Sequence, residues 1–377
     1  MPNRLIRRIG RKLGPGAAAG KNKRGTMESD SLLDQLYEAK VTKIRHETSR
    51  AVSVEFELLD GYRLKYKAGQ FVNVSFPLGA ALFQRCYSFS SAPEENRYTI
   101  TIQKVFKGRI SSYAKSELKV GDKLYIDEPD GAFVTPDSQP ESQRYIMIAA
   151  GAGVVPIFSL VKDLLGKNSD ADIQMVYVSR DKEQALFLRE LERLKREHSG
   201  FTLRVHYTRS QILGQDQYGR LDSEALISEL ADPANANMYL CGPYGLIRKC
   251  AEGFERLGLP KSKIKIETFS STPASSVVKH LKPHSITFLP SGLLGKPVRT
   301  RQQQVEPILD SARDVGVNYP QDCSIGNCQA CKVKIHSGIL LMEEPNGLTI
   351  SDAKNGYVLG CVAYPCTPVV ARQAPKS

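Results

Sequence analysis

The chain of 377 residues is long enough for two or three domains, and its 41% hydrophobic and 24% charged residues are ordinary for a soluble globular protein. Its net charge of +12 is concentrated in residues 1–25, which hold eight of the 52 Lys and Arg residues and none of the 40 acids, leaving +4 for the rest. We therefore expect no nucleic-acid-binding face, and we expect no membrane span or secretory signal, because no apolar stretch is long and unbroken enough.

Residues 1–35 form a predicted basic tail. Apolar residues between its cations allow a short amphipathic helix that would contact an anionic membrane surface. The Gly- and Ala-rich stretch over residues 14–20 favours a disordered tail instead, and we prefer that interpretation. Met27 as an alternative start of the protein also stays open.

Residues 36–138 are predicted to form an antiparallel β-barrel. Apolar and polar residues alternate with period two in Val52–Leu58, Gln70–Phe76 and Tyr98–Gln103, and turn residues separate these runs. Short strands at this spacing are typical of an antiparallel barrel. The helical pattern in this segment is confined to Ser111–Leu118.

Two short motifs in the barrel segment indicate a site for a phosphate-bearing ring compound. Arg85 supplies a cation for a phosphate, Tyr87 an aromatic face and Ser88 a short hydrogen-bonding group. Gly108–Ser111 lets backbone N–H groups approach an anion at a helix N-terminus. Each motif alone is a weak signal, and Tyr87 is also compatible with an ordinary strand tyrosine, but their order upstream of an α/β segment is specific.

Residues 139–270 are predicted to form an α/β domain, because buried-type strands alternate with helical segments, which implies a parallel sheet covered on both faces. The predicted strands lie over residues 145–150, 173–178, 202–207, 237–240 and 263–268. The predicted helices lie over residues 156–165, 183–198, 222–230 and 243–257.

The first strand–helix turn of this domain contains Gly151 and Gly153. Small residues there allow the phosphates of a dinucleotide to contact the backbone. Pro156 stands where the third glycine of the Rossmann pattern would be, so the pattern alone also fits a simple tight turn. Cys241–Pro243 ends another strand on the same sheet edge, where ligands of open α/β folds bind.

Residues 271–283 are a predicted linker, because the segment begins with a run rich in Ser, Thr and Pro. Residues 284–377 are predicted to form a third domain. It begins with a strand over residues 284–289 and continues with a helix over residues 305–315. A cysteine motif follows that helix directly.

The cysteine motif is the strongest chemical signal in the chain. Cys323, Cys328 and Cys331 have the spacing C-x4-C-x2-C, and Cys361 follows after 29 residues, which is the plant-type [2Fe–2S] spacing. A zinc site would need a second pair, and a disulfide framework suits short secreted chains. We therefore predict a [2Fe–2S] cluster. Cys366 is an alternative fourth ligand that the spacing disfavours.

These motifs, in this order, resemble the ferredoxin–NADP reductase superfamily over about residues 40–270. With the C-terminal segment, the chain resembles the reductase components of bacterial oxygenases and desaturases, such as the phenylacetyl-CoA epoxidase and ketosteroid hydroxylase reductases. The resemblance implies a flavin-binding β-barrel, an α/β nucleotide domain and an α+β, β-grasp ferredoxin domain. It implies a cytoplasmic oxidoreductase that passes electrons from NADPH or NADH through FAD and a [2Fe–2S] cluster to a terminal oxygenase, hydroxylase or desaturase.

The resemblance also implies roles for single residues. Seven match positions that hold the flavin in the family: Arg85, Tyr87, Ser88, Gly108, Ile110, Ser111 and Phe269. Six residues match the nucleotide-binding turn and the element beside the nicotinamide: Gly151, Gly153, Pro156, Cys241, Gly242 and Pro243. The stretch that begins at Gly108 favours FAD over FMN.

Ser88 and Cys241 are the candidate catalytic residues that the resemblance implies. Ser88 would lie near the reactive flavin nitrogen, and Cys241 would position the nicotinamide rather than act as a nucleophile. Glu267 and Phe269 resemble the family's E-x-F end. Val155 departs from the Thr or Ala that is frequent in the family, so a hydrogen bond made there by some members should be absent.

The choice between NADPH and NADH rests on Arg180 and Arg209, which follow the second and third strands of the α/β domain. Either guanidinium can hold a 2′-phosphate, which favours NADPH, and both are also compatible with solvated cations of an NADH-binding protein. We prefer NADPH.

The terminal acceptor is open at this level. Residues 284–377 carry nine Lys and Arg against seven Asp and Glu, so we expect mixed or apolar contacts of the partner with Ser324, Ile325 and Asn327. Alternatives are a hybrid-cluster protein, a quinone or ferric iron as acceptor. A redox sensor or carrier with a vestigial flavin site is a further alternative.

Overall fold

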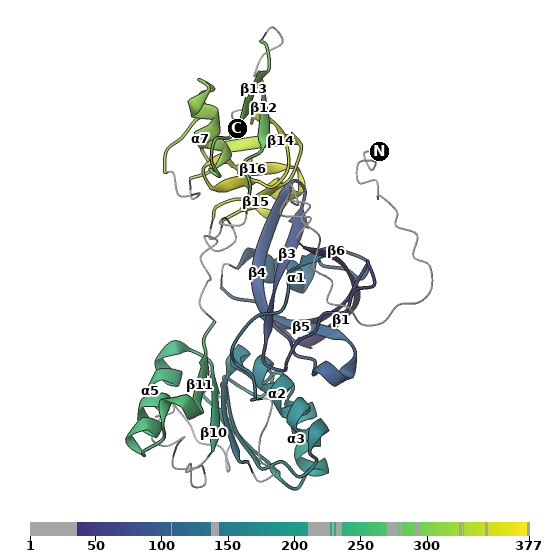
Figure 1. Cartoon of the computed structure of the whole chain (residues 1–377), viewed down its shortest axis with the longest axis vertical. Coiled ribbons are helices and arrows are strands. Elements are labelled where there is room, and N and C mark those ends of the chain that lie inside the picture. The colour runs from purple at the N-terminus through teal and green to yellow at the C-terminus, as the bar shows by residue number, and fades with distance from the viewer. Residues whose placement is uncertain are drawn as a thin grey trace, which may run out of the picture.

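The computed structural model describes residues 36–106, 108–136, 143–209, 227, 230, 236–269, 278, 281–290, 295–323, 326, 328–343 and 346–374. The predicted basic tail lies outside these residues, as do most of the predicted linker and most of the helix predicted over residues 222–230. Three bodies follow one another along the long axis of the molecule (Figure 1). The α/β domain lies at one end, the barrel in the middle and the cysteine-containing C-terminal domain at the other end.

The barrel is an antiparallel sheet in the order β4-β3-β6-β1-β2-β5. Its strands are β1 (Tyr37–Thr48), β2 (Ala51–Leu58), β3 (Phe71–Leu78), β4 (Ala81–Ser88), β5 (Tyr98–Gln103) and β6 (Lys123–Ile126). Val52, Val54 and Phe56 alternate into the core, as their period of two predicts. In the described part of the chain, β4 and β5 meet through the isolated bridge Phe89–Ile100, so no full ladder closes the barrel.

The α/β domain is a parallel sheet in the order β11-β10-β7-β8-β9. Its strands are β7 (Tyr145–Ala150), β8 (Ile173–Ser179), β9 (Phe201–Tyr207), β10 (Asn237–Cys241) and β11 (Ile264–Glu267). Helices α2 (Val154–Lys167) and α3 (Leu188–Glu197) share a core on one face, and α5 (Tyr244–Arg256) packs on the other face (Figure 1). The predicted fold class of this domain is confirmed.

Local backbone geometry corrects two predicted helix starts. The helix predicted from residue 183 begins at Leu188, because Phe187 before it is in the left-handed region with φ +57°. The helix predicted from residue 305 is α7 (Ile308–Asp314), and Pro307 before it is extended with ψ 147°. The long apolar stretch from Tyr145 is the buried strand β7 followed by α2. Across the described residues, no helix is both long and apolar enough to cross a membrane.

The C-terminal domain is a mixed sheet in the order β13-β12-β18-β14-β16. Its strands are β12 (Ser285–Leu289), β13 (Val298–Arg301), β14 (Lys332–Ser337), β16 (Tyr357–Leu359) and β18 (Val369–Gln373). Ile308, Leu309 and Ala312 of α7 are buried in its core. The short helix α8 (Ile350–Lys354) precedes β16, and Thr349 caps it by accepting from the Asp352 N–H.

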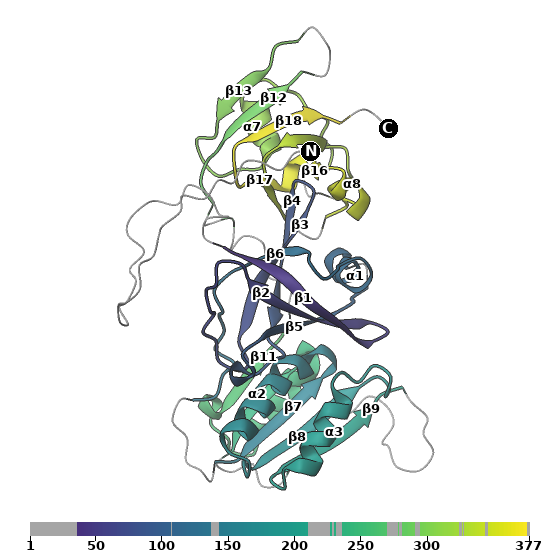
Figure 2. The same cartoon turned by 90° about the vertical axis from the view of Figure 1, so that its right-hand side faces the viewer.

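Two short strands of the C-terminal domain extend the barrel sheet. β15 (Leu340–Met342) pairs in parallel with β4 through Leu340–Ala81 and Leu341–Leu82, and β17 (Ala363–Pro365) continues the sheet beyond β15. The β3–β4 hairpin extends from the barrel to the C-terminal domain in both views (Figures 1 and 2). One apolar core runs without interruption through the barrel and the C-terminal domain.

Candidate functional site

The first candidate site lies where the barrel meets the carboxyl edge of the parallel sheet. The end of β4 and the end of β11 approach each other there, and the Ser88 hydroxyl donates to Glu267 Oε2 at 3.4 Å. Cys241 ends the neighbouring strand β10 and is fully buried. The structure therefore brings both candidate catalytic residues, Ser88 and Cys241, to the same end of the α/β domain as Glu267.

Burial determines the protonation states of Glu267 and Cys241. Desolvation raises the pKa of the Glu267 carboxyl to about 7, although the hydrogen bond from Ser88 opposes the rise. Burial, with a smaller contribution from the Glu267 charge, raises the pKa of the Cys241 thiol well above its ordinary value. The thiol is thus neutral at physiological pH, which fits a packing and positioning role and not that of a nucleophile. Glu267 can hold or release a proton near neutral pH.

Two glycines let the candidate nucleotide-binding turn pack against the end of β10. Gly151 has φ +57°, and a Cβ on Gly153 would lie 2.1 Å from the Cys241 carbonyl oxygen. A Cβ on Gly242 would in turn lie 2.7 Å from the Ala150 Cβ. Any side chain at 153 or 242 would therefore separate the two segments that sequence reasoning assigned to one site.

The ends of the same sheet carry exposed rings and cations. Phe269, two residues past β11, is 50% exposed, and Tyr244 at the start of α5 is 65% exposed. Arg180 and Arg209 follow β8 and β9, and the Arg209 N–H donates to the Arg180 carbonyl at 2.8 Å. Both arginines are exposed, so their guanidinium groups lie where an anionic group of a ligand at this sheet edge can reach them.

The barrel supplies a second part of this site. Arg85 and Tyr87 alternate on β4 and so share one face of the strand. The Arg85 guanidinium donates to the Gln84 carbonyl at 2.7 Å, and the Tyr87 ring meets the edge of Phe76 at 6.2 Å between ring centres. Both side chains are half-buried, which leaves them able to contact a ligand along the strand.

The start of α1 (Arg109–Ser116) is built as a close-approach backbone turn. The Ser111 hydroxyl accepts from the Val105 N–H and donates to the Gly108 carbonyl, both at 3.2 Å. A Cβ on Gly108 would lie 2.3 Å from the Val105 side chain, so no larger residue fits there. Ile110 is buried in the barrel core and anchors the helix. This cradle fits the diphosphate of a dinucleotide at the helix N-terminus.

The second candidate site is the cysteine loop of the C-terminal domain, defined as residues 323–331 without the undescribed residues 324, 325 and 327. The Cys328 N–H donates to Cys323 Sγ at 3.3 Å, and Cys331 Sγ lies 3.3 Å from Cys361 Sγ. Gly326 has φ +77°, and a Cβ there would lie 2.9 Å from the Val362 side chain. The sulfurs of Cys331 and Cys361 thus lie together, and the Cys328 backbone approaches the Cys323 sulfur across a tightly closed loop.

This donor set fits a [2Fe–2S] cluster, because each of its two irons takes two protein thiolates. The hydrogen bond between the two thiols lowers the pKa of Cys331 and raises that of Cys361, so these two sulfurs share one proton. Among the described side chains, no group of three His, Cys, Asp or Glu residues is placed to hold a single metal ion. Cys366 is fully buried, and burial raises its pKa to about 12, so its environment is that of a core thiol.

Three family models match successive parts of the chain. An oxidoreductase FAD-binding domain matches residues 38–134, an oxidoreductase NAD-binding domain residues 147–252, and a 2Fe–2S iron–sulfur cluster binding domain residues 293–366. The expected cofactors are thereby confirmed as FAD, a pyridine nucleotide and a [2Fe–2S] cluster.

The chain is similar to known proteins over most of its length. The chain is 27% identical over 346 residues to a component of the 1,2-phenylacetyl-CoA epoxidase of Escherichia coli K12, covering 87% of this chain and 94% of that protein. It is 27% identical over 359 residues to the ferredoxin reductase component of the 3-ketosteroid-9-alpha-monooxygenase of Mycolicibacterium smegmatis, covering 91% and 98%. The solved structure of phthalate dioxygenase reductase has a TM-score of 0.53 at 21% identity, covering 90% and 98%, and shares the three-domain fold.

Proposed function

We propose that this chain is the reductase component of a terminal oxygenase. In this proposal it is a ferredoxin–NADP reductase of the form that carries a C-terminal ferredoxin domain. It takes electrons from NAD(P)H and passes them through FAD and a [2Fe–2S] cluster. The observation that carries this proposal is the pairing of β15 with β4, because it places a cluster-binding domain on the strand whose other end is Ser88.

In this proposal the barrel binds and orients the flavin. Arg85 and the N–H groups at the start of α1 hold phosphate oxygens, and Tyr87 supports the ring system. Ser88 would lie at the reactive edge of the ring, with its hydroxyl hydrogen-bonded to Glu267. When bound, the flavin and the cluster supply the conversion of a hydride into single electrons.

The sheet edge of the α/β domain positions the nicotinamide. Gly151, Gly153 and Pro156 form the turn for the nucleotide phosphates, while Cys241, with Gly242 and Pro243 after it, shapes the place of the nicotinamide ring. Glu267 holds a proton within hydrogen-bonding distance of Ser88, and its pKa of about 7 allows the exchange of that proton at physiological pH. Phe269 is half exposed, so its ring would be able to cover a bound flavin and to give way to the nicotinamide.

We assign the cluster to Cys323, Cys328, Cys331 and Cys361, and the contact between the sulfurs of Cys331 and Cys361 supports these two as ligands of one iron. We place the protein in the cytoplasm, where reducing conditions keep such thiols available for a cluster. The adjacent Arg180 and Arg209 support NADPH as the donor, because two guanidinium groups at the ends of neighbouring strands can hold a 2′-phosphate.

Turnover with artificial acceptors tests the proposal. In the protein loaded with FAD and cluster, NADPH should drive reduction of ferricyanide and of cytochrome c, and removal of the cluster should abolish the second activity. Arg180→Ala should raise KM for NADPH and leave KM for NADH unchanged. Absence of ferricyanide reduction with either nucleotide would refute the reductase function.

A further inference from the structure

Arg109 connects the two candidate sites. It occupies the first position of α1, directly after Gly108 of the close-approach turn. Its guanidinium donates to Asn346 Oδ1 at 2.7 Å and also to the Asn346 backbone carbonyl. It further lies 5.4 Å from the centre of the Phe83 ring on β4. One side chain thus links α1 and β4 of the barrel to the C-terminal domain.

Asn346 in turn belongs to the segment that holds the cysteine loop. The N–H of the next residue, Gly347, donates to the Gly326 carbonyl at 2.7 Å, and the Gln329 side chain donates to the Gly347 carbonyl at 2.8 Å. A Cβ on Gly326 would lie 3.1 Å from the Asn346 Cβ. A displacement of Asn346 is therefore transmitted directly to the loop that carries Cys323, Cys328 and Cys331.

A second polar link crosses the same interface away from the cysteine loop. Lys354 of α8 pairs with Glu117 at 2.7 Å and lies 5.2 Å from the centre of the Tyr113 ring. Both charged side chains of this pair are more than 40% exposed. An exposed pair of this kind contributes little to stability. It therefore offers a matched control at the other end of the same helix, α1.

We propose that Arg109 is a positioning residue that fixes the cysteine loop against the start of the flavin-binding helix and thereby sets the rate of electron transfer from flavin to cluster. This inference rests on the proposed function. The bidentate contact gives it geometric specificity, because a planar guanidinium that donates to two oxygens of one residue fixes both distance and orientation. A small displacement remote from the reacting groups is enough to slow a reaction strongly.

Anaerobic rapid mixing of the full chain, loaded with FAD and cluster, with NADPH tests this role. The flavin and cluster absorbance bands are followed separately. In Arg109→Met, which keeps an apolar stem over Phe83, flavin reduction should stay within twofold of the wild type while cluster reduction slows at least tenfold. Arg109→Lys should lie in between. Lys354→Met should match the wild type.

A second variant and a second readout separate positioning from cofactor binding. Asn346→Asp keeps an acceptor for Arg109 and for the Leu348 N–H but loses the donation to the Glu343 carbonyl, so it should slow cluster reduction less than Arg109→Met does. Hydrogen exchange at residues 326 and 328–329 should accelerate in Arg109→Met and not in Lys354→Met. Unchanged cluster reduction in Arg109→Met, or a loss of FAD with slowed flavin reduction, would overturn the positioning role. Failure of the wild-type cluster to accept electrons from the reduced flavin would instead overturn the proposed function.

Discussion

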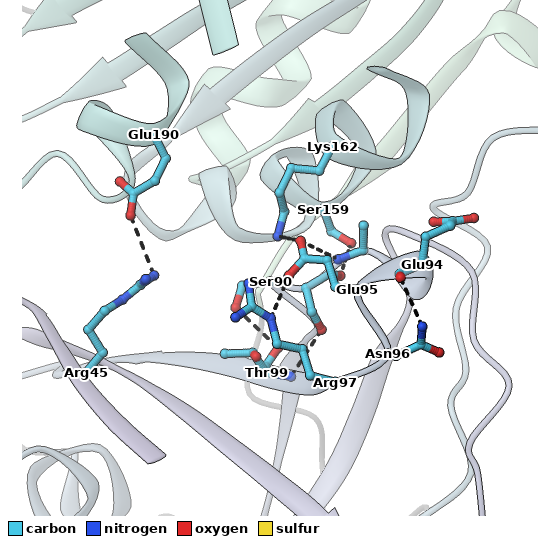
Figure 3. Close-up of polar contacts among 12 residues, drawn as sticks. Arg45, Ser90, Glu94, Glu95, Asn96, Arg97, Thr99, Ser159, Lys162 and Glu190 are labelled. Atoms are coloured by element: carbon cyan, nitrogen blue, oxygen red, sulfur yellow. Dashed lines mark hydrogen bonds and ion pairs between the residues drawn. The ribbon is translucent and has the colours of Figure 1, made fainter. Parts of the chain in front are cut away.

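The barrel is attached to its two neighbours by different kinds of interface. Toward the α/β domain, polar side-chain contacts (Figure 3) surround a small apolar patch, in which Ala51, Ala68 and Phe133 of the barrel join the α/β core. Ser159 of α2 donates to the Ser91 carbonyl at 2.6 Å, Lys162 pairs with Glu95, and Arg45 reaches Glu190 of α3 at 3.7 Å. Water can replace such partners when the domains separate.

Toward the C-terminal domain, the barrel makes backbone and apolar contacts. β15 joins the edge of β4, the Leu340 N–H donates to the Ala80 carbonyl at 2.9 Å, and one apolar core spans both bodies. Relative motion of domains is the default for polar interfaces and is suppressed by extensive apolar ones. We therefore expect the interface with the ferredoxin domain, which adds strand pairing and a larger apolar core, to be the more rigid of the two.

The largest expected effect distinguishes the activity of the flavin from that of the cluster. Cys361→Ser removes an assigned ligand of the cluster, so cytochrome c reduction should fall at least 100-fold while ferricyanide reduction by the flavin persists. The matched control Cys366→Ala alters a buried thiol of the core and should keep the cluster absorbance. Loss of the cluster in Cys366→Ala with retention in Cys361→Ser would show that the assignment of the fourth ligand is wrong.

Breaking the apolar interface should have the next largest effect. A Cβ on Gly79 in the β3–β4 turn would lie 2.1 Å from the Ala353 carbonyl of α8, so Gly79→Ala should push the ferredoxin domain away and slow cluster reduction about tenfold. Gly61 has a similar φ of +74° with nothing within 4 Å. Gly61→Ala therefore adds the same backbone strain, about 1 kcal/mol, without the clash. Equal rates of cluster reduction in the two variants would contradict a rigid contact between the barrel and the ferredoxin domain.

The sequence predicts some of these structural features and not others. The period of two in Val52–Leu58 and the cysteine spacing predicted the barrel and the cluster, because both depend on local order. The pairing of β15 with β4 could not be predicted, since a strand of three residues has no readable period. The contact of Arg109 with Asn346 joins residues 237 positions apart and has no local signal. The predicted partner contacts at Ser324, Ile325 and Asn327 fall outside the described residues and stay predictions.

The polar interface should give a smaller effect, on stability. Lys162 and Glu95 are each about 80% buried in their pair, so Lys162→Met leaves the Glu95 carboxylate with Arg97 and the Ala92 N–H and should cost about 1–3 kcal/mol of unfolding free energy. Glu190→Gln breaks the longer, more exposed pair with Arg45 and should cost less than about 0.5 kcal/mol. Urea unfolding of both variants measures the difference. Equal losses would show that the buried pair does not hold this interface.

The last prediction is a pH dependence at the first candidate site. The pKa of Glu267 is raised from 4.5 to about 7, so the folded state binds its proton more tightly than the unfolded state does. The resulting stability is fully present below pH 4.5 and is lost as pH rises through 7, with a change of up to about 3 kcal/mol. Glu267→Gln should remove this difference between pH 5 and pH 8. An unchanged pH dependence of unfolding in the variant would exclude Glu267 as its source.

Anaerobic titration tests most directly whether electrons pass from NAD(P)H through the flavin to the cluster within one chain. The full chain, loaded with FAD and cluster, is titrated with NADPH and with NADH while the visible spectrum is recorded. We expect the flavin and cluster bands to bleach together, with NADPH the more effective donor. Bleaching of the flavin band while the cluster stays oxidised, at excess nucleotide, would contradict the account.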